Sequence, residues 1–222
     1  MAAKQVTKKT QKNTSDTIID AYMKQVMESE MFPKSIYKFC KEHNFSEKEF
    51  YDSFASFDGI QKEIWNSFFT NSMQLVQKSK GYDSLTNKEK MLTFFYTFFE
   101  ILTANRSYVL FVLKEHKEIM KNLVQLKGLR KYVKGFASEL IAEANEEKSL
   151  SFLKQSETVF SEGAWIQTLF LLKFWMDDDS PAFENTDVAI EKSVRAIFDV
   201  FETQPLESLL DFGKFLWKEK MA

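Results

Sequence analysis

The 222-residue sequence predicts an all-α fold, and three observations lead to this expectation. Glycine (6 residues) and proline (3 residues) are scarce, which leaves little turn chemistry for many short strands. Apolar residues recur at three- or four-residue spacing along most of the chain, as they do on one face of a helix. Two capping boxes, Ser46 with Glu49 and Thr86 with Glu89, mark helix starts. Together these patterns predict nine or ten helices and no strand.

The N-terminal part of the chain predicts a basic arm followed by three helices. Residues 1–14 hold four lysines and no acidic residue, which is typical of a disordered arm. A first helix is expected at about 15–30, and two short helices are expected at about 34–42 and 46–53. Asn44 suits the left-handed conformation that ends the first short helix. Two short helices joined by a tight turn predict a helix-turn-helix, a motif whose usual partner is DNA.

The rest of the chain, residues 57–222, predicts a larger helical domain. Its helices are expected at about 57–80, 86–104, 107–120, 123–146, 157–176, 187–202 and 206–220. Phenylalanine is unusually frequent, at 23 residues, most of them after position 90. These rings either line a large apolar pocket or form an aromatic core. The candidate ligand-binding residues are Phe95, Phe99, Arg106, Phe136, Trp165 and Phe170. Arg106 either pairs with an anionic head group of the ligand or is a solvated surface residue.

Residues 15–56 contain the candidate DNA contacts. These are Lys34, Ser35, Lys38, Ser46, Glu47, Lys48 and Tyr51. Lys34 and Ser35 stand at the start of the second helix, where they either hold a backbone phosphate or cap the helix. Lysines in both short helices and in the N-terminal arm supply positive charge that DNA phosphates require.

The third helix is acidic, which sets it apart from most DNA-reading helices. It carries Glu47, Glu49 and Asp52 against the single Lys48. Phosphate contacts supply much of the affinity for DNA, so carboxylates near the groove weaken binding. Glu49 is explained by its capping box, whereas Glu47 and Asp52 have no such explanation. A carboxylate can nevertheless accept a hydrogen bond from cytosine N4.

Several functional classes are disfavoured by what the sequence lacks. The single cysteine, Cys40, rules out an internal disulfide and a cysteine-based zinc site, and we expect it to be a core thiol. His43 and His116 have no accompanying nucleophile, carboxylate pair or metal spacing, and no glycine-rich phosphate loop occurs. The run Asp177 to Asp179 is expected to be a loop of solvated charges, with cation binding as the less favoured alternative. We therefore predict no catalytic residue, no metal site and no cofactor.

The overall charge and hydropathy predict a cytoplasmic protein. The net charge of −2 argues against a uniformly basic nucleic-acid binder but leaves room for a local basic surface. No apolar run of about 18 residues and no signal peptide are present, so we expect no stable membrane insertion.

The first third of the chain resembles TetR-family transcriptional regulators in particular residues. The matching positions are Thr17, Ile18, Ile19 and Ala21, then Pro33, Ser35 and Ile36, then Ser46, Phe50, Tyr51 and Phe54, and finally Ser56, Phe57, Asp58, Ile60 and Ile64. The third group follows the family pattern S-x-x-x-L-Y-x-x-F. Two departures are the stretch 30–32, where the family usually has a glycine, and the acidic third helix.

This resemblance implies a TetR-like fold, with a three-helix DNA-binding domain before a helical domain for ligand binding and dimerisation. It also implies that Tyr51 contacts a phosphate, although a half-buried packing role is an alternative. The helices expected at 157–176 and 187–202 would pair with their symmetry mates into a four-helix bundle. The chain would then be a repressor that binds palindromic double-stranded operator DNA as a homodimer through residues 34–54. A small hydrophobic effector would release it by a population shift.

A second interpretation keeps the fold without DNA binding. The acidic third helix and the phenylalanine-rich second domain would then suit a protein that handles lipid or quinone. Such a protein is similar to the Coq9 family of ubiquinone biosynthesis, which is TetR-like but acts on lipid. The chain would then be a lipid- or quinone-binding accessory protein, with the helix at 206–220 associating with a membrane surface. A purely dimerising or scaffolding role is a third possibility.

Overall fold

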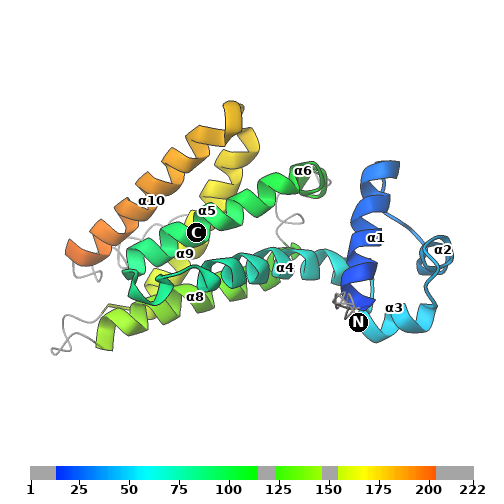
Figure 1. Ribbon diagram of the computed structural model, residues 1–222, viewed down its shortest axis with the longest axis horizontal. Coiled ribbons are helices and arrows are strands. Elements are labelled where there is room, and N and C mark those ends of the chain that lie inside the picture. The colour runs from blue at the N-terminus through cyan, green and yellow to red at the C-terminus, as the bar shows by residue number, and fades with distance from the viewer. Residues whose placement is uncertain (1–13, 115–123, 147–154, 204–222) are drawn as a thin grey trace, which may run out of the picture. The chain divides into compact units, whose positions relative to one another are not determined.

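The computed structural model describes residues 14–114, 124–146 and 155–203 (Figure 1). Within these ranges every regular element is a helix, which confirms the expected all-α class. The chain divides into two compact units, the first ending at Ile64 and the second beginning at Trp65. The expected basic arm before Thr14 and the expected helix at 206–220 lie outside the described residues.

The first unit consists of short helices around an aromatic core. Its elements are α1 (Thr14–Ser29), α2 (Ile36–Glu42), α3 (Glu47–Ser53) and the beginning of α4 (Phe57–Lys78). The ring centroids of Phe39, Phe50 and Tyr22 lie 5.5, 5.6 and 5.7 Å from that of Phe57. Gln61 Nε2 donates to the Tyr22 hydroxyl at 3.0 Å. These contacts hold α2 and α3 against α1 and the start of α4.

Two residues with positive φ end helices in the first unit. Asn44 has φ 59° after α2, which confirms the expected left-handed conformation. Glu30 has φ 51° after α1, in the left-handed region that glycine adopts without strain. Both turns therefore use the left-handed conformation without a glycine.

The second unit is built from the rest of α4 and the helices that follow it. These are η1 (Tyr82–Ser84), α5 (Asn87–Ala104), α6 (Arg106–Lys114), α8 (Lys127–Glu146), α9 (Glu157–Asp177), η3 (Pro181–Phe183) and α10 (Glu184–Thr203). α8 packs most extensively against α9, and α10 packs against α5 and α9. α10 begins three residues earlier than expected, and α8 begins after a turn rather than at residue 123.

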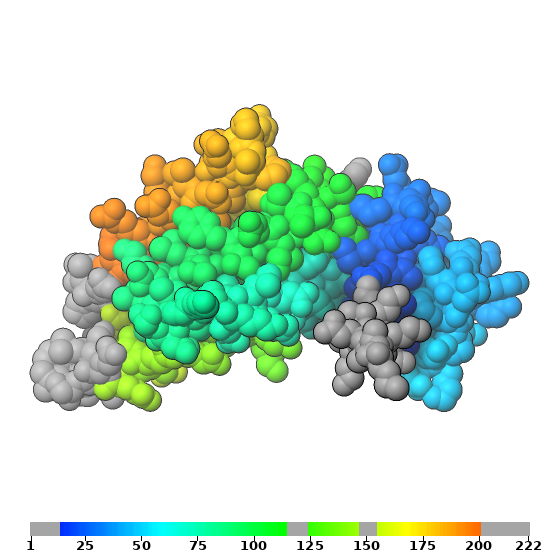
Figure 2. Space-filling view, in the orientation of Figure 1, coloured from blue at the N-terminus to red at the C-terminus, as the bar shows by residue number. Residues whose placement is uncertain are grey.

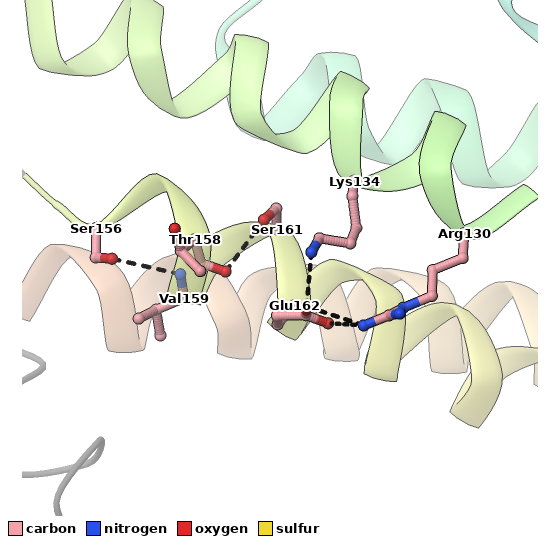
Figure 3. A network of polar contacts seen from close by, with 7 residues as sticks. All are labelled: Arg130, Lys134, Ser156, Thr158, Val159, Ser161 and Glu162. Carbon is pink, nitrogen blue, oxygen red and sulfur yellow. Dashed lines mark hydrogen bonds and ion pairs between the residues drawn. The ribbon is translucent and has the colours of Figure 1, made fainter. Parts of the chain in front are cut away.

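A charged cluster joins α8 to α9 (Figure 3). Arg130 Nη2 lies 2.9 Å from both carboxylate oxygens of Glu162, and Lys134 Nζ lies 2.6 Å from Oε1. The hydrogen bonds from Lys134 and then Arg130 lower the pKa of Glu162 below its usual range. Figure 3 also shows Ser156 capping the start of α9, where its hydroxyl accepts a hydrogen bond from the Val159 N–H. This cluster and cap position α9 along α8.

The interior between α5 and α8 is aromatic. Phe94 stacks on Phe98 with ring centroids 5.6 Å apart, and it contacts Phe136 of α8 at 5.2 Å. Where α5 meets α8, Asn87 Nδ2 donates to the Leu140 carbonyl, and Lys90 forms an ion pair with Glu143. Burial of this many rings gives α5 and α8 a large hydrophobic contact.

The start of α8 comes unusually close to α4. A Cβ atom added at Gly128 would lie 2.1 Å from Oδ1 of Asn66, so only glycine fits without movement of that side chain. In the turn before α8, Gln125 Oε1 accepts a hydrogen bond from the Trp65 indole N–H at 2.9 Å, and Gln125 Nε2 donates to the Val112 carbonyl. A buried glutamine thus links α4 to α6. No helix in the described ranges is long and apolar enough to cross a membrane.

Candidate functional site

The start of α3 has a complete capping box, as expected. The Glu49 carboxylate accepts from the Ser46 N–H at 2.8 Å and from its hydroxyl at 2.7 Å, and the Glu49 N–H donates to Ser46 Oγ. The hydrogen bonds from Ser46 lower the pKa of Glu49. Ser46 and Glu49 are therefore engaged in starting the helix, and this explains one of its three carboxylates.

A second carboxylate of α3 is neutralised by its neighbour along the helix. Lys48 Nζ lies 2.6 Å from Oδ2 of Asp52, and the two side chains are 82% and 62% exposed. Hydrogen bonding and charge from Asp52 raise the pKa of Lys48. The four-residue spacing of Lys48 and Asp52 along the helix is the sequence signal for this ion pair. Glu47, also exposed, is the remaining carboxylate of this helix.

The candidate contacts on α2 and α3 all lie in the first unit. Ser35 caps α2, with its hydroxyl accepting from the Lys38 N–H at 3.3 Å. Lys34 and Lys38 are exposed. Tyr51 is 55% exposed, with its ring edge-on to Phe50, so it is free to reach a partner outside the unit.

The charge of the first unit is unfavourable for DNA. Residues 14–64 contain ten carboxylates and six lysines. Positive side chains on the helix-turn-helix are Lys34, Lys38, Lys41 and Lys48. Any anion-binding surface of this described part must therefore be local.

His43 and Cys40 have structural surroundings. His43 is the C-cap residue of α2, and its Nε2 lies 3.1 Å from Oε1 of Gln25 on α1. Cys40 is buried, as expected for a core thiol. Burial, followed by the charges of Glu47 and Glu49, raises the pKa of Cys40, which disfavours the reactive thiolate.

Three of the candidate ligand-binding residues belong to one aromatic network. Phe95, Phe99 and Phe136 are all buried. The Phe94 ring centroid lies 5.3 Å from that of Phe95 and 5.2 Å from that of Phe136, and Phe95 and Phe99 are 6.5 Å apart. The network continues from Phe99 to Trp175 of α9, at 6.2 Å. These three candidate residues therefore pack directly against other aromatic rings.

Arg106 clamps the end of α9. Its guanidinium donates to the carbonyl of Trp175 at 2.8 Å and to those of Met176 and Asp178 at 3.3 Å. It also lies 4.4 Å from the ring centroids of both Trp175 and Phe183. Burial lowers the pKa of Arg106, whereas Asp178 opposes that effect. The side chain thus satisfies helix C-terminal carbonyls that would otherwise lack a donor.

The structure corrects one expectation about the acidic run after α9. Asp178 is buried, at 7% exposure, rather than solvated. Its carboxylate accepts hydrogen bonds from the N–H and hydroxyl groups of both Ser180 and Thr186, at 2.6–2.9 Å. The sequence signal for this arrangement is an aspartate followed two residues later by a serine, a pattern typical of an Asx-turn.

The remaining two candidates, Trp165 and Phe170, lie on α9. Trp165 is buried, whereas Phe170 is 50% exposed and borders an open groove of about 460 Å³. The other residues of this groove are Phe174, Asn185, Val188, Ala189, Lys192 and Ser193. Ile166 precedes Phe170 by one turn and is 66% exposed. Ile166, Phe170 and Phe174 thus form an exposed apolar stripe, which their four-residue spacing could have revealed.

The described residues contain no group of three or more histidine, cysteine, aspartate or glutamate side chains arranged to hold a metal ion.

Residues 90–216, more than half of the chain, match a family model described as tetracyclin repressor-like, C-terminal domain. The match begins within α5 and includes α6, α8, α9 and α10. No curated protein and no solved structure matches the chain.

Proposed function

Because the chain belongs to the tetracyclin repressor-like (TetR) family, we propose that it is a transcriptional regulator that binds operator DNA as a homodimer and is released by a small hydrophobic ligand. The observation that carries this proposal is a well-formed helix-turn-helix, α2 and α3, in the unit that precedes the matched domain. In this proposal residues 1–14 are a basic arm, 15–56 bind DNA, and 57–222 bind the effector and dimerise.

DNA binding by the first unit relies on a few exposed side chains. Lys34, Lys38 and Lys48 are the cations that would meet phosphates or base edges, and Tyr51 offers an exposed hydroxyl. Glu49 is not among the proposed DNA contacts, because its carboxylate accepts hydrogen bonds from the Ser46 N–H and hydroxyl. Binding of this kind depends strongly on salt, since each neutralised phosphate releases counterions.

Dimerisation is supported by the apolar stripe of α9 and its groove with α10. Figure 2 shows α10, in orange, at the surface of the second unit. Ile166, Phe170 and Phe174 of α9 are exposed, as is Val188 of α10. Exposed apolar side chains at helical spacing are what a bundle of two helices from each protomer would bury. A two-fold axis would then present two helix-turn-helix motifs to two operator half-sites.

The effector would occupy the aromatic interior of the second unit. Phe95, Phe99 and Phe136 are already in a network of ring contacts, so a ligand that enters among them must separate rings. An anionic ligand would have to draw the Arg106 guanidinium away from the α9 carbonyls. Either change would alter the packing of α9, and a ligand that favours the altered packing shifts the population away from the DNA-binding state.

Fluorescence anisotropy with duplexes from the region upstream of the protein's own gene tests this proposal. Full-length protein should bind such DNA tightly at low salt and progressively more weakly as salt rises. The variant K34E/K38E should bind more weakly and with a smaller salt slope. The control K24E reverses a charge on α1, at a side chain paired with Glu28, and should have a smaller effect. Absence of salt-dependent binding at low salt would refute the DNA-binding role.

A second candidate function is favoured by the excess of carboxylates in residues 14–64. In this alternative the fold binds a lipid or quinone and the first unit does not meet DNA. Native mass spectrometry and organic extraction of the purified protein should then recover a bound apolar molecule. Protein that is free of such a molecule, and that fails to take up added quinone or phospholipid, would count against it.

A further inference from the structure

The ion pair between Lys48 and Asp52 occupies the outermost face of α3. Phe50, the buried anchor of this helix, is two residues from each partner. At about 100° per residue, a two-residue step places a side chain on nearly the opposite side of the helix. Lys48 and Asp52 therefore both point away from the core of the unit, in keeping with their high exposure. This is the face that a helix-turn-helix presents to the major groove.

The two ends of this pair match the major-groove edge of one G·C base pair. Guanine offers two acceptors there, N7 and O6, and cytosine offers the N4 amino group as a donor. Guanine O6 and cytosine N4 share a Watson–Crick hydrogen bond, which places them about 2.9 Å apart. The ammonium and carboxylate of the pair are 2.6 Å apart, a similar separation. A donor and an acceptor at this spacing can therefore meet an acceptor and a donor on the base pair.

The neighbouring carboxylates are less suited to such a contact. Glu49 is held by Ser46 in the capping box. Glu47 lies three residues before the buried Phe50, so at about 100° per residue its side chain points closer to the core side of α3 than those of Lys48 and Asp52. Asp52 is the carboxylate that carries its own counter-charge, so it can approach the groove with less repulsion from phosphates than an unpaired carboxylate.

We propose that Lys48 and Asp52 together read one G·C base pair in each operator half-site, with Lys48 donating to guanine O6 and N7 and Asp52 accepting from cytosine N4. This assignment rests on the proposed DNA binding and names the base pair that α3 specifies. It gives the acidic character of the helix a role in sequence discrimination. An A·T pair offers only one purine acceptor, N7, to the ammonium, so it is the weaker partner.

Selection from a randomised duplex library, followed by affinity measurements on single duplexes, tests the assignment. Full-length protein should select sites with a G·C pair at a constant place in each half-site. Replacing that pair by A·T should weaken binding about tenfold to a hundredfold. Replacing guanine by inosine keeps the major-groove edge and should leave the affinity within about twofold, because only the minor-groove amino group is lost.

Two variants and one control separate base reading from general electrostatics. D52A and K48M should both bind G·C and A·T duplexes with affinities that differ by less than about threefold. D52A removes both the acceptor oxygens and a negative charge, so its affinity for unrelated DNA should rise even as discrimination is lost. The control E28Q neutralises the acidic partner of another exposed pair in the same unit, Lys24 with Glu28, and should keep the full preference. Circular dichroism spectra of all variants should overlay.

The outcomes distinguish this inference from the proposed function. If wild-type protein selects DNA without a constant G·C pair, or selects A·T there, the inference is overturned and DNA binding stands. Retention of the G·C preference by D52A and K48M also overturns it, as does a large loss of affinity for the inosine duplex. If wild-type protein selects no DNA at low salt, the proposed function itself fails, and the inference falls with it.

Discussion

Glu30 has a backbone conformation that side chains rarely adopt. Its φ of 51° lies in the left-handed region, where an L-residue is strained by its Cβ atom. Asn44 has a similar φ of 59°, but asparagine tolerates this region better than glutamate does. Both residues are exposed, so their conformations are imposed by the path of the chain between helices rather than by packing of their side chains.

Glu30→Gly should therefore stabilise the protein. Relief of the strain exceeds the extra entropy that glycine brings to the unfolded chain, giving a net gain of about 0.5–1 kcal/mol. Denaturation by urea, followed by circular dichroism, measures the change. Asn44→Gly is the matched control and should gain less. A loss of stability in Glu30→Gly would show that the Glu30 side chain contributes more than its backbone costs.

Asp178 makes stability depend on acid pH. Burial alone would raise the pKa of Asp178, but hydrogen bonds from Ser180 and Thr186 outweigh this effect and lower it from 3.8 to about 2. A carboxylate whose pKa is lower in the folded protein contributes stability that is complete above the unfolded pKa. That contribution, about 2 kcal/mol, is lost as the pH falls from about 4 toward 2.

Asp178→Asn should remove this acid-dependent contribution. The variant should be less stable than wild type at pH 7, and the difference should shrink as the pH falls from about 5 to 2. Urea midpoints measured across that range give the comparison. Asp179→Asn is the control, because its exposed carboxylate belongs to the same loop, and its effect should stay within about 0.5 kcal/mol. A constant difference between wild type and Asp178→Asn would contradict the assignment.

At the scale of the elements, Arg106 connects the start of α6 to the end of α9. Its planar guanidinium reaches three carbonyls and lies against two aromatic rings, a geometry that a lysine ammonium cannot reproduce. The contact joins helices that lie about 70 residues apart in the sequence. Its effect is to complete the C-terminus of α9 before the chain turns into α10.

Arg106→Lys should destabilise the second unit by about 1–3 kcal/mol, because buried carbonyls lose their donors while the charge is kept. Arg195→Lys is the control. Arg195 is 71% exposed and makes a pair with Asp199 on one face of α10, so its replacement should change stability by less than about 0.5 kcal/mol. Thermal unfolding of both variants provides the measurement. Equal, small effects would mean that Arg106 is free for another partner, such as an anionic ligand.

At the scale of the whole molecule, the apolar stripe on α9 predicts assembly. Phe170→Glu combined with Phe174→Glu places two charges in the proposed interface and should convert the dimer to a monomer. Sedimentation velocity at micromolar concentration measures the change in mass. Leu75→Glu is the control, since Leu75 is 56% exposed on α4 and outside the stripe. Monomeric wild-type protein, or a dimer unaffected by both charges, would contradict the interface.

Local features of the sequence predicted most of the fold. The capping boxes at Ser46 and Thr86 and the left-handed Asn44 depend on residues within a few positions, and the structure confirms all three. The helix ranges of the first unit were expected within about two residues of those observed. Helix periodicity also identified the buried rings of α5, because one face of a helix is set by spacing alone.

The site residues were less predictable because their roles depend on distant parts of the chain. The phenylalanines of α5 could line a pocket or fill a core, and the sequence alone left both possibilities open. In the described residues, Phe94 and Phe95 contact other rings directly. The partner of Arg106 lies some 70 residues away, and no spacing rule indicates such a contact. Asp178 likewise looked like one of three solvated acids until its burial was known.

The sequence by itself therefore determined the helices, their caps and the family of this protein, because these features reside in short-range patterns and in residue order. The tertiary structure decided which side chains remain available to a partner. It engaged Arg106 with the carbonyls at the end of α9, and it left Ile166 and Phe170 exposed on that helix. The physical reason is that exposure and contacts between distant residues depend on how each helix is rotated against its neighbours, and packing sets that rotation.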